Sequence, residues 1–378
     1  MTEIHGFCDD RFEPVRQAMA TNFAQGLEQG ASVAITMDGQ PLVDLWAGDA
    51  DDSGTPWAED TIANVYSTTK TMAATTMLVL ADRGLVDLDA PVADYWPEFA
   101  TNGKDGVLVR HVMSHTAGLS GFDPPISATD LYDQDAVAAG LAKQTPWWEP
   151  GTASGYHAIT QGHLQAEIVR RVTGRTLGTF FREEIAEPLG ADFHIGLPEF
   201  EDHRVAQLVA PDLGLRMAQM DLDSIAARSL LSCPLDGTEP RTRAWRAAEI
   251  PAAGGTGNAR SVGRVHSALA CGGEVDGVRI MSEATVERIL EEQSETIDLV
   301  LGMKIRFGMG FGLMNETIPL STSPRAFFWG GWGGSIALVD LDRRMTVSYV
   351  MNKMAPELIG DLRGAMIVLA AYQSLAEG

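Results

Sequence analysis

The sequence predicts an α+β fold in which one antiparallel sheet is formed from both ends of the chain and is flanked by helices. Two β-prone runs stand near the N-terminus, and strand character returns only from Phe327 onward. The stretch between them has helical patterns joined by irregular loops rich in Pro, Gly and Asp. Strands at both ends favour one sheet with an inserted, mostly helical domain. We expect a discontinuous sheet domain of residues 1–84 and 247–378, a helical domain of residues 85–246, and an active site at their junction.

The first expected elements are a hairpin and a helix. Residues 31–37 and 41–47 are β-prone, and Asp38-Gly39-Gln40 between them carries the Asp-Gly signal of a tight turn. A helix is expected from Ser67 to Gly84. Ser67 is a permitted N-cap residue, apolar residues recur after it at helical spacing, and Gly84 is a typical stop.

Further helices are expected at residues 161–173 and 176–187. Near the end of the chain, strands are expected at residues 327–328, 335–340 and 345–351, followed by a closing helix over residues 356–375. The sequence shows no repeat of fixed period and no low-complexity tract. A single packed protein with two differently built parts is the expected result.

The composition indicates a globular and strongly acidic protein. Hydrophobic residues make up 45% of the 378 residues and charged residues 21%, which is enough apolar material for a large core. The 28 Lys and Arg stand against 51 Asp and Glu, giving a formal net charge of −23. Such a charge repels phosphate backbones and anionic lipid surfaces. We therefore expect neither nucleic acid nor a membrane as a partner.

The cysteines and the N-terminal residues favour a soluble cytoplasmic protein. Residues 1–20 contain acidic side chains and no continuous apolar run, and no later stretch has the roughly 18 apolar residues of a membrane span. Cys8, Cys233 and Cys271 are odd in number, far apart and free of any CxxC pair. This spacing suggests reduced thiols, not a disulfide framework or a structural zinc site.

Two other patterns resemble cofactor or metal motifs only superficially. His111 and His115 have the i, i+4 spacing of a zinc pair, but Val112 occupies the place of the glutamate that metalloproteases use as a base. We interpret both histidines as part of a structural turn. The glycines at 308, 310 and 312 lack the spacing and the βαβ setting of a dinucleotide fingerprint. We expect no metal and no cofactor.

Ser67 and Lys70 form a candidate nucleophile and base. A serine needs a base within hydrogen-bond reach to react at neutral pH, and residues three apart lie on one face of a helix. Of the five lysines, Lys70 alone has a serine three residues before it. The alternative is an N-capping serine followed by a solvated lysine. These residues alone leave the two interpretations equally open.

Further motifs follow Ser67-Thr-Thr-Lys70 in a recognisable order, namely Met113-Ser-His-Thr-Ala-Gly-Leu119, Tyr156 after Glu149-Pro-Gly, and Trp329-Gly-Gly-Trp-Gly-Gly-Ser335. Over roughly residues 31–354, this order resembles the serine β-lactamase and penicillin-binding protein superfamily. It is most similar to the esterase branch, the family VIII carboxylesterases related to class C β-lactamases. The resemblance implies the β-lactamase/transpeptidase-like fold and catalysis through an acyl-enzyme.

The resemblance also implies roles for particular residues. Tyr156 would be a second base beside Ser67 and Lys70, with a nearby ammonium favouring its phenolate. The backbone N–H groups of Ser67 and Trp332 would form the oxyanion hole. Without the resemblance, Tyr156 is typical of a buried aromatic residue whose hydroxyl has a hydrogen-bond partner. The glycines near Trp332 are typical of a bulge or a strand bend.

Two departures from the lactamase pattern bear on the substrate. The Tyr-x-Asn triplet is here Tyr156-His157-Ala158, and the Lys-Thr-Gly triplet is here Trp329-Gly330-Gly331. The amide, cation and hydroxyl that help bind a β-lactam or a peptide carboxylate are therefore missing, which favours uncharged substrates. The expected substrate-binding residues are Trp329, Gly330, Gly331, Trp332 and His157, with Phe328 and Trp147 or Trp148 as further apolar lining. Each tryptophan alone is more typical of a core.

The expected function is that of a serine carboxylesterase that cleaves small, mostly uncharged esters through an acyl-enzyme on Ser67. A weak β-lactamase, a D-amino-acid peptidase or amidase, and an acyltransferase are alternatives of the same fold, and a catalytically silent binding protein is one of another class. An α/β-hydrolase is disfavoured because no serine lies within Gly-x-Ser-x-Gly. Lys70 and Tyr156 are both open as the first proton acceptor, since strongly coupled groups titrate as a unit. The oligomeric state is left open.

Overall fold

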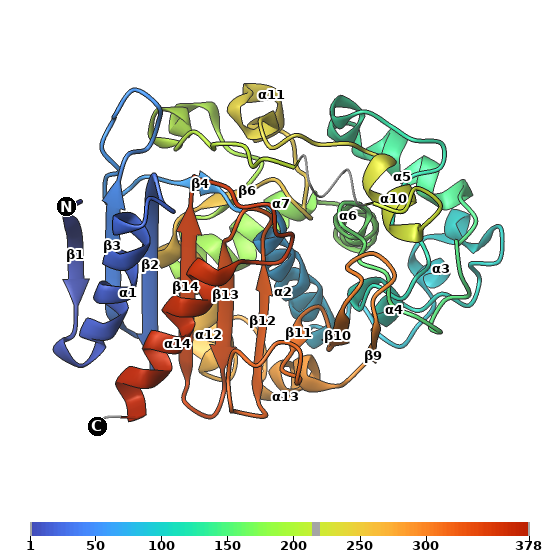
Figure 1. The fold of residues 1–378 in the computed structure, drawn as a ribbon. Coiled ribbons are helices and arrows are strands. Elements are labelled where there is room, and N and C mark those ends of the chain that lie inside the picture. Colours follow the sequence, from blue (N-terminus) through green and yellow to red (C-terminus); the bar gives the residue numbers. More distant parts are fainter. Residues whose placement is uncertain (1, 214–219, 377–378) are drawn as a thin grey trace.

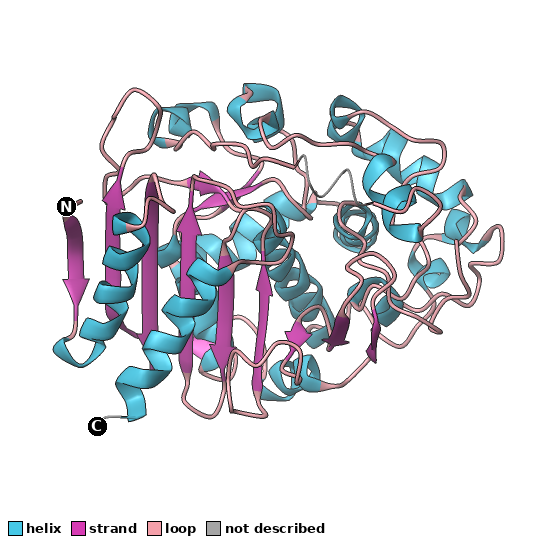
Figure 2. Cartoon of the chain, in the orientation of Figure 1, coloured by secondary structure: helices cyan, strands magenta, loops and turns pink. Residues whose placement is uncertain are grey.

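The computed structural model describes residues 2–213 and 220–376 of the chain (Figures 1 and 2). Its strands are β1 Ile4–Cys8, β2 Gly30–Met37, β3 Gln40–Gly48, β4 Ala63–Asn64, β5 His194–Ile195, β6 Gly255–Gly257, β7 Glu274–Val275, β8 Val278–Arg279, β9 Ser294–Ile297, β10 Lys304–Phe307, β11 Gly312–Leu313, β12 Ala326–Gly330, β13 Ile336–Asp340 and β14 Met345–Met351. Its α-helices are α1 Glu13–Ala24, α2 Thr69–Asp82, α3 Val92–Tyr95, α4 Val109–Met113, α5 Gln134–Lys143, α6 Thr160–Thr173, α7 Leu177–Phe181, α8 Glu187–Leu189, α10 Ile225–Leu231, α11 Arg243–Ala247, α12 Ala259–Ala270, α13 Glu283–Glu287 and α14 Leu362–Ala376.

The main sheet is built from both ends of the chain, as expected. Its nine strands have the order β1-β3-β2-β14-β13-β12-β11-β10-β9, and each neighbouring pair is antiparallel. The junction between the two ends is the pairing of β2 with β14, where Met37 lies opposite Met345 and Ala31 lies opposite Met351. Strands β1, β2 and β3 from the N-terminal part therefore extend a sheet whose other strands come from the last part of the chain (Figure 1).

The hairpin between β2 and β3 forms where the Asp-Gly signal predicts it. Asp38 has a φ of 51° and Gly39 a φ of 77°. Two consecutive residues with positive φ are typical of the type I′ turn, whose twist matches that of the flanking strands. The turn places Met37 opposite Gln40 at the start of the ladder.

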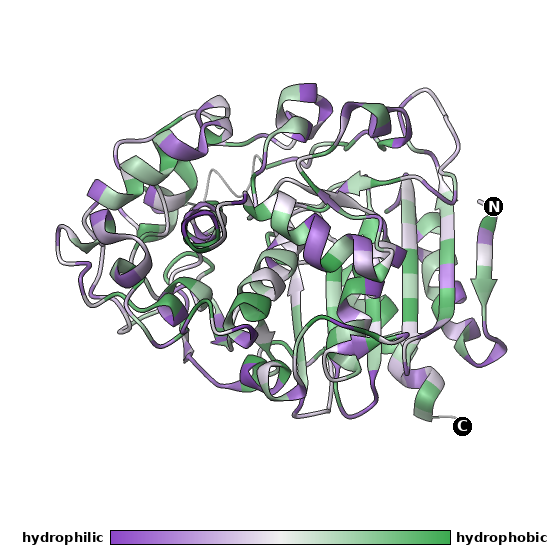
Figure 3. Cartoon of the chain, turned by 180° about the vertical axis from the view of Figure 1, so that it is seen from behind, coloured by the Kyte–Doolittle hydropathy of each residue, from purple (hydrophilic) through white to green (hydrophobic). Residues whose placement is uncertain are grey.

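Helices cover both faces of this sheet. Helices α1 and α14 lie together on one face, and α12 lies on the other against β2, β13 and β14 (Figure 1). All seven residues of β14 are consequently buried, although alternate side chains of a strand point to opposite faces. Apolar residues are concentrated in these central strands, while hydrophilic residues mark the outer sides of the helices (Figure 3).

Helix α2 passes through the interior of the molecule. Every residue from Thr69 to Leu80 is buried, so the helix has no solvated face. The helix begins at Thr69, two residues later than expected, because the 3₁₀ turn Tyr66–Thr68 precedes it. Ser67 makes no capping hydrogen bond to the helix. The expectation that Ser67 caps the helix is therefore wrong. The predicted stop is confirmed, since Gly84 follows the last turn with a left-handed φ of 67°.

The middle of the chain is mostly helical and packs beside the sheet (Figure 2). Helix α6 matches its predicted range, whereas the helix expected at residues 176–187 is divided into α7, a π-helical turn at Arg182–Ala186, and α8. Strand β5 is an exception to the helical pattern, and it pairs with β6 in the small sheet β4-β6-β5. Within the described ranges, no helix is both long and apolar enough to cross a membrane.

Candidate active site

Ser67 lies between β4 and α2, in the 3₁₀ turn that precedes the helix. The residue before it, Tyr66, is buried and has a positive φ of 42°, a conformation that side-chain-bearing residues rarely adopt. Such strained backbone persists only where the surrounding structure imposes it, and it occurs frequently at functional sites. Ser67 itself is 7% exposed and lines a cavity. The turn therefore presents this hydroxyl to a small internal space.

Lys70 lies one helical turn after Ser67, and its amine is directed at the serine. The distance from Lys70 Nζ to Ser67 Oγ is 3.1 Å, and Nζ also lies 2.6 Å from the carbonyl oxygen of Ala158 and 2.9 Å from that of Ala252. The side chain is buried. Burial lowers the pKa of Lys70 well below its usual value. The amine of Lys70 is therefore neutral over a wider pH range than that of an exposed lysine.

Tyr156 completes the group from a different part of the chain. Its side chain is 1% exposed, and its backbone N–H donates to Asp298 Oδ1 at 3.0 Å. Lys70 Nζ lies 4.9 Å from the centre of the phenol ring. Burial raises the pKa of Tyr156, although the neighbouring side chains of Ser67 and Trp329 act in the opposite direction. The expected phenolate is therefore not favoured here, because loss of hydration outweighs those neighbours.

The glycine turn after β12 packs directly against the nucleophile segment. A Cβ atom added at Gly331 would lie 2.1 Å from the carbonyl oxygen of Val65 and 2.4 Å from Ser335 Oγ, so only glycine fits. Ser335 Oγ donates to the same Val65 carbonyl at 2.9 Å and also lies 2.9 Å from Thr68 Oγ1. This close approach places Trp332 at the cavity together with Ser67.

The cavity beside Ser67 has a volume of about 260 Å³ and is mostly apolar. Its lining comes from several separate parts of the chain and consists of Tyr66, Ser67, Ser120, Gly121, Phe122, Tyr156, Ala158, Ile159, Thr160, Leu213, Met220, Ser229, Leu230, Leu231, Ser232, Cys233, Pro234, Leu235, Asp236, Ala253, Trp332 and Leu358. Asp236 is the only charged residue among these described lining residues. The described part of the lining therefore offers no cation to a bound carboxylate.

Four hydroxyl groups of the lining, those of Ser120, Ser229, Ser232 and Thr160, are engaged within the protein. Ser120 Oγ and Ser229 Oγ lie 2.6 Å apart, Ser232 Oγ donates to the carbonyl of Ser229 at 2.7 Å, and Thr160 Oγ1 donates to the carbonyl of Leu119 at 2.6 Å. These bonds satisfy polar atoms that would otherwise face the ligand space. The cavity is thus suited to a hydrocarbon group.

Several residues predicted to bind substrate do not line this cavity. His157 is fully buried, and its Nε2 accepts a hydrogen bond from the N–H of Leu119 at 3.0 Å. Trp329 packs behind Tyr156, with ring centres 5.4 Å apart. A Cβ at Gly330 would lie 2.5 Å from the backbone nitrogen of Gly360. The lining also excludes Gly331, Phe328, Trp147 and Trp148. Of the five predicted binding residues, only Trp332 reaches the cavity.

His111 and His115 both accept hydrogen bonds from backbone groups. His111 Nδ1 accepts from the N–H of Leu108 at 3.2 Å, and His115 Nδ1 accepts from the N–H of His157 at 3.0 Å. His115 also lies edge-on to the ring of Tyr156, with ring centres 4.9 Å apart. Burial lowers the pKa of His115 well below its usual value, which keeps the imidazole neutral. Both contacts agree with a structural turn, which supports the Tyr156 segment.

Sequence reasoning missed two kinds of functional group. The carbonyls of Ala158 and Ala252 contact the amine of Lys70, but carbonyls carry no residue-specific signal that a sequence pattern could reveal. The apolar wall from Leu230 to Leu235 was also missed. Its leucines are a weak signal, because a short apolar stretch indicates burial without indicating which part of the protein covers it.

The fold and this geometry are those of a class of serine hydrolases. In this class an α+β fold places a lysine beside the serine that stands three residues before it. The Beta-lactamase family model matches residues 15–371, and the chain therefore belongs to the Beta-lactamase family.

Individual relatives agree with this assignment. The chain is 36% identical over 379 residues to the Esterase/beta-lactamase LipL of Mycobacterium tuberculosis, covering 94% of this chain and 84% of that protein. A crystal structure of a family VIII carboxylesterase is 44% identical, with a TM-score of 0.92 over 98% of this chain and 100% of that one. A penicillin-binding protein homologue from Caulobacter crescentus is 41% identical, with a TM-score of 0.89 over 99% and 100% of the two chains.

Proposed function

We propose that this protein is a serine carboxylesterase that hydrolyses small, uncharged esters through an acyl-enzyme on Ser67. The observation that carries the proposal is the contact of 3.1 Å between Lys70 Nζ and Ser67 Oγ, made by a buried amine at the edge of an apolar cavity. A nucleophilic serine requires an adjacent base, and burial supplies the lowered pKa that a lysine base requires.

The neutral amine of Lys70 has a geometry suited to accept the serine proton. A neutral amine has two N–H donors and one lone pair, and two of its three contacts are carbonyl oxygens, those of Ala158 and Ala252. With both N–H groups donating to these carbonyls, the lone pair is left for the hydroxyl of Ser67. The two carbonyls therefore orient the base as well as holding it.

The proposed reaction has two acyl-transfer steps. Ser67 Oγ attacks the ester carbonyl while its proton passes to the Lys70 and Tyr156 pair, and the N–H groups of Ser67 and Trp332 bind the negative oxygen. The C–O bond to the alcohol then breaks, and the alcohol leaves with that proton. Water attacks the acyl-enzyme by the same route and releases the acid, with Ser67 regaining its proton.

The lining of the cavity supports esters without a charge. A β-lactam or a peptide C-terminus carries a carboxylate, and no Lys or Arg occurs among the described lining residues. The names of the relatives point the same way, since one solved structure is a family VIII carboxylesterase. Residual β-lactamase activity is a second candidate, supported by the name Esterase/beta-lactamase of the Mycobacterium tuberculosis relative. Nitrocefin turnover as fast as ester turnover would place that activity first.

Labelling with a fluorophosphonate tests the proposal. Wild-type protein should form a stable adduct on Ser67, located by peptide mass spectrometry, and should hydrolyse short p-nitrophenyl esters. Ser67→Ala should lose both. Ser229→Ala is a matched control, because this serine also lines the cavity but its hydroxyl lies against Ser120. Full ester turnover by Ser67→Ala would overturn the proposal.

We further propose that the enzyme works in the cytoplasm. Cys8, Cys233 and Cys271 are all free thiols in the structure. Free thiols persist in reducing compartments.

A further inference from the structure

The turn that contains Trp332 is held from behind by the segment before α14. The carbonyl oxygen of Gly331 accepts hydrogen bonds from the N–H groups of Gly360 and Gly334, both at 3.1 Å. This carbonyl and the Trp332 N–H belong to one planar trans peptide, in which they point in opposite directions. Fixing the carbonyl therefore directs the N–H to the other side. No backbone acceptor for that N–H occurs in the described part of the chain.

A second carbonyl of the turn is bound by Arg363. The Gly333 carbonyl oxygen accepts from Arg363 Nη2 at 2.6 Å and from the N–H of Ala355 at 2.9 Å. Gly333 and Gly334 have φ values of 99° and 130°, which L side chains rarely adopt. A Cβ at Gly334 would lie 2.5 Å from Asp361 Oδ2. The turn thus lies directly on the pair formed by Arg363 and Asp361.

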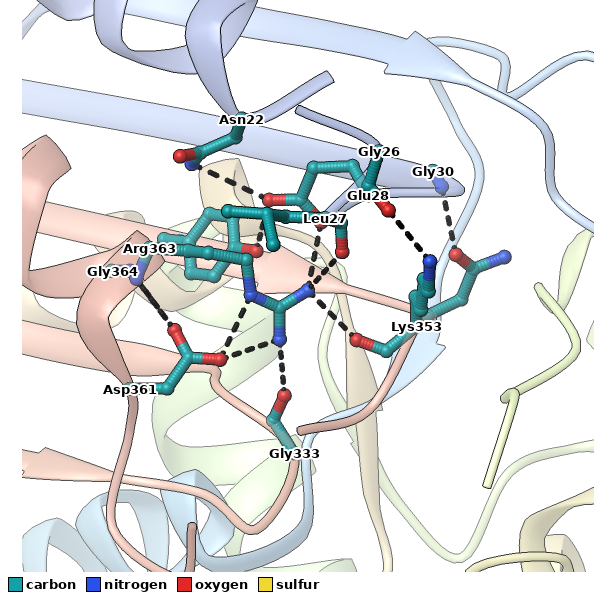
Figure 4. A network of polar contacts seen from close by, with 12 residues as sticks. Asn22, Gly26, Leu27, Glu28, Gly30, Gly333, Lys353, Asp361, Arg363 and Gly364 are labelled. Carbon is teal, nitrogen blue, oxygen red and sulfur yellow. Dashed lines mark hydrogen bonds and ion pairs between the residues drawn. The ribbon is translucent and has the colours of Figure 1, made fainter. Parts of the chain in front are cut away.

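Arg363 uses its whole guanidinium group at this position (Figure 4). Nε and Nη2 donate to Asp361 Oδ2 at 2.8 and 2.5 Å. Nη1 donates to Glu28 Oε2 at 3.0 Å, to the carbonyl of Leu27 at 3.0 Å and to that of Lys353 at 2.8 Å. The side chain is 6% exposed, and that of Glu28 is 1% exposed. A rigid planar fork can satisfy such contacts at fixed angles, whereas a lysine ammonium cannot.

The cluster ties three distant parts of the chain together. Glu28 belongs to the loop before β2, Asp361 and Arg363 belong to the start of α14, and Gly333 belongs to the turn beside Ser67. Buried ion pairs contribute little net stability, because loss of hydration offsets their attraction. Their directional bonds nevertheless fix geometry, and here the geometry they fix is that of the turn.

We propose that Arg363 is a positioning residue of the oxyanion hole, acting through the Gly333 carbonyl to hold the Trp332 N–H at the cavity. This inference rests on the proposed role of the Trp332 N–H in ester hydrolysis. Glu28 and Asp361 hold the guanidinium in place from opposite sides.

The variants Arg363→Lys and Arg363→Met test this role. The concentration of working sites is first titrated with a fluorophosphonate, and kcat and KM are then measured per titrated site. Losing one oxyanion donor costs about 10²–10³ in kcat. A donor that is only displaced should cost less, so Arg363→Met should lower kcat about 10- to 100-fold while KM changes less than about 3-fold. Arg363→Lys should retain an intermediate kcat.

Inhibition by a boronic acid provides the second readout, because its tetrahedral adduct places an anionic oxygen in the hole. Its inhibition constant should rise by the same factor as kcat falls. Arg171→Met is the matched control, since Arg171 also bonds a carboxylate that is 1% exposed, that of Glu167 at 2.6 Å, but lies on α6. It should keep kcat and KM within about 2-fold of wild type.

Wild-type kcat in the Arg363 variants, or an equal loss in Arg171→Met, would overturn the inference. If Arg363→Met does not fold, Arg363→Lys decides the question by the same measurements. Failure of the proposed esterase function would look different, because the wild-type protein itself would then neither hydrolyse esters nor be labelled at Ser67.

Discussion

At the scale of single residues, burial sets the chemistry of the candidate site. Lys70 and Tyr156 are both deeply buried, and burial disfavours the charged form of each. It lowers the pKa of the amine and raises that of the phenol, so both groups are moved towards neutrality. The amine is then the better proton acceptor and the phenol the better proton donor. This division of roles follows from hydration and requires no counter-charge.

The first prediction concerns the pH dependence of the reaction. In the proposed mechanism the base form of Lys70 is the active one, and burial lowers the pKa of this amine. The value of kcat/KM should therefore fall as the pH drops below the lowered pKa of Lys70, where the amine gains a proton, and this fall should occur at a lower pH than an ordinary lysine would give. Lys70→Met should lower kcat about 10²- to 10⁴-fold, the usual contribution of a general base. Ester kinetics between pH 4 and 10 measure this, and an unchanged profile in Lys70→Met would contradict it.

The second prediction separates activity from stability at Tyr156. Its phenol oxygen is buried without a hydrogen-bond partner of normal geometry among the described residues. Tyr156→Phe should therefore keep the melting temperature or raise it, while kcat falls about 10²- to 10⁴-fold. Tyr95→Phe is the reverse control, because the Tyr95 oxygen accepts from the N–H of Asp87 at 2.7 Å. It should lose about 1 kcal/mol and keep its activity.

These opposite outcomes can be measured by thermal unfolding and ester kinetics on the same samples. A Tyr156→Phe variant that loses stability as well as activity would show that the phenol is bonded in the working enzyme.

At the scale of elements, the glycine turn after β12 packs directly against the segment that contains Ser67. Gly331 packs against the carbonyl oxygen of Val65, and the space between them has no room for a Cβ atom. The sequence predicted that Gly330 and Gly331 bind the substrate. In the structure, the backbone that approaches Gly331 is the protein's own, just before Ser67.

The third prediction follows from that contact. In Gly331→Ala the new Cβ would lie 2.1 Å from the Val65 oxygen, so the turn must move away from Ser67. Overpacking of this kind costs about 1–3 kcal/mol, and the displaced turn should lower kcat at least about 10-fold. Gly106→Ala is the control, since nothing lies within 4 Å of its Cβ. Chemical denaturation and ester kinetics test both, and normal turnover in Gly331→Ala would refute the coupling.

The elements also show where local patterns are sufficient and where they are not. The hairpin at Asp38 was predicted correctly, because a type I′ turn depends on two adjacent residues alone. The last helix was expected from residue 356 but starts at Leu362. The residues before it form the loop whose N–H groups bond to Gly331 and Gly333, and a local pattern cannot reveal that distant partners use them.

At the scale of the whole molecule, the charge of −23 is the dominant property. Self-repulsion among like charges destabilises the compact state, and salt screens it over a Debye length of about 10 Å at 0.1 M. Surface ion pairs are screened as well, but each contributes little. The net effect of added salt should therefore be stabilising.

The fourth prediction is a rise in melting temperature of about 2 °C or more between 10 and 300 mM NaCl at pH 7. The rise should disappear near pH 4.6, where the net charge of the sequence is close to zero. Differential scanning calorimetry in both buffers makes the comparison. A melting temperature that falls with salt at pH 7 would mean that attractive ion pairs outweigh the net repulsion.

The amino-acid sequence predicted the sheet formed from both chain ends, the hairpin and the pairing of Ser67 with Lys70. The hairpin and the Ser67–Lys70 pair depend on local geometry, since a helical turn brings residues three apart together wherever that turn lies. The sheet followed from the positions of the strand patterns along the chain. The folded structure was needed to reveal the direction of the pKa shifts of Lys70 and Tyr156, the carbonyls that hold Lys70, the apolar wall from Leu230 to Leu235 and the burial of His157. Burial and such partners arise when distant segments pack together, and residue spacing does not encode that packing.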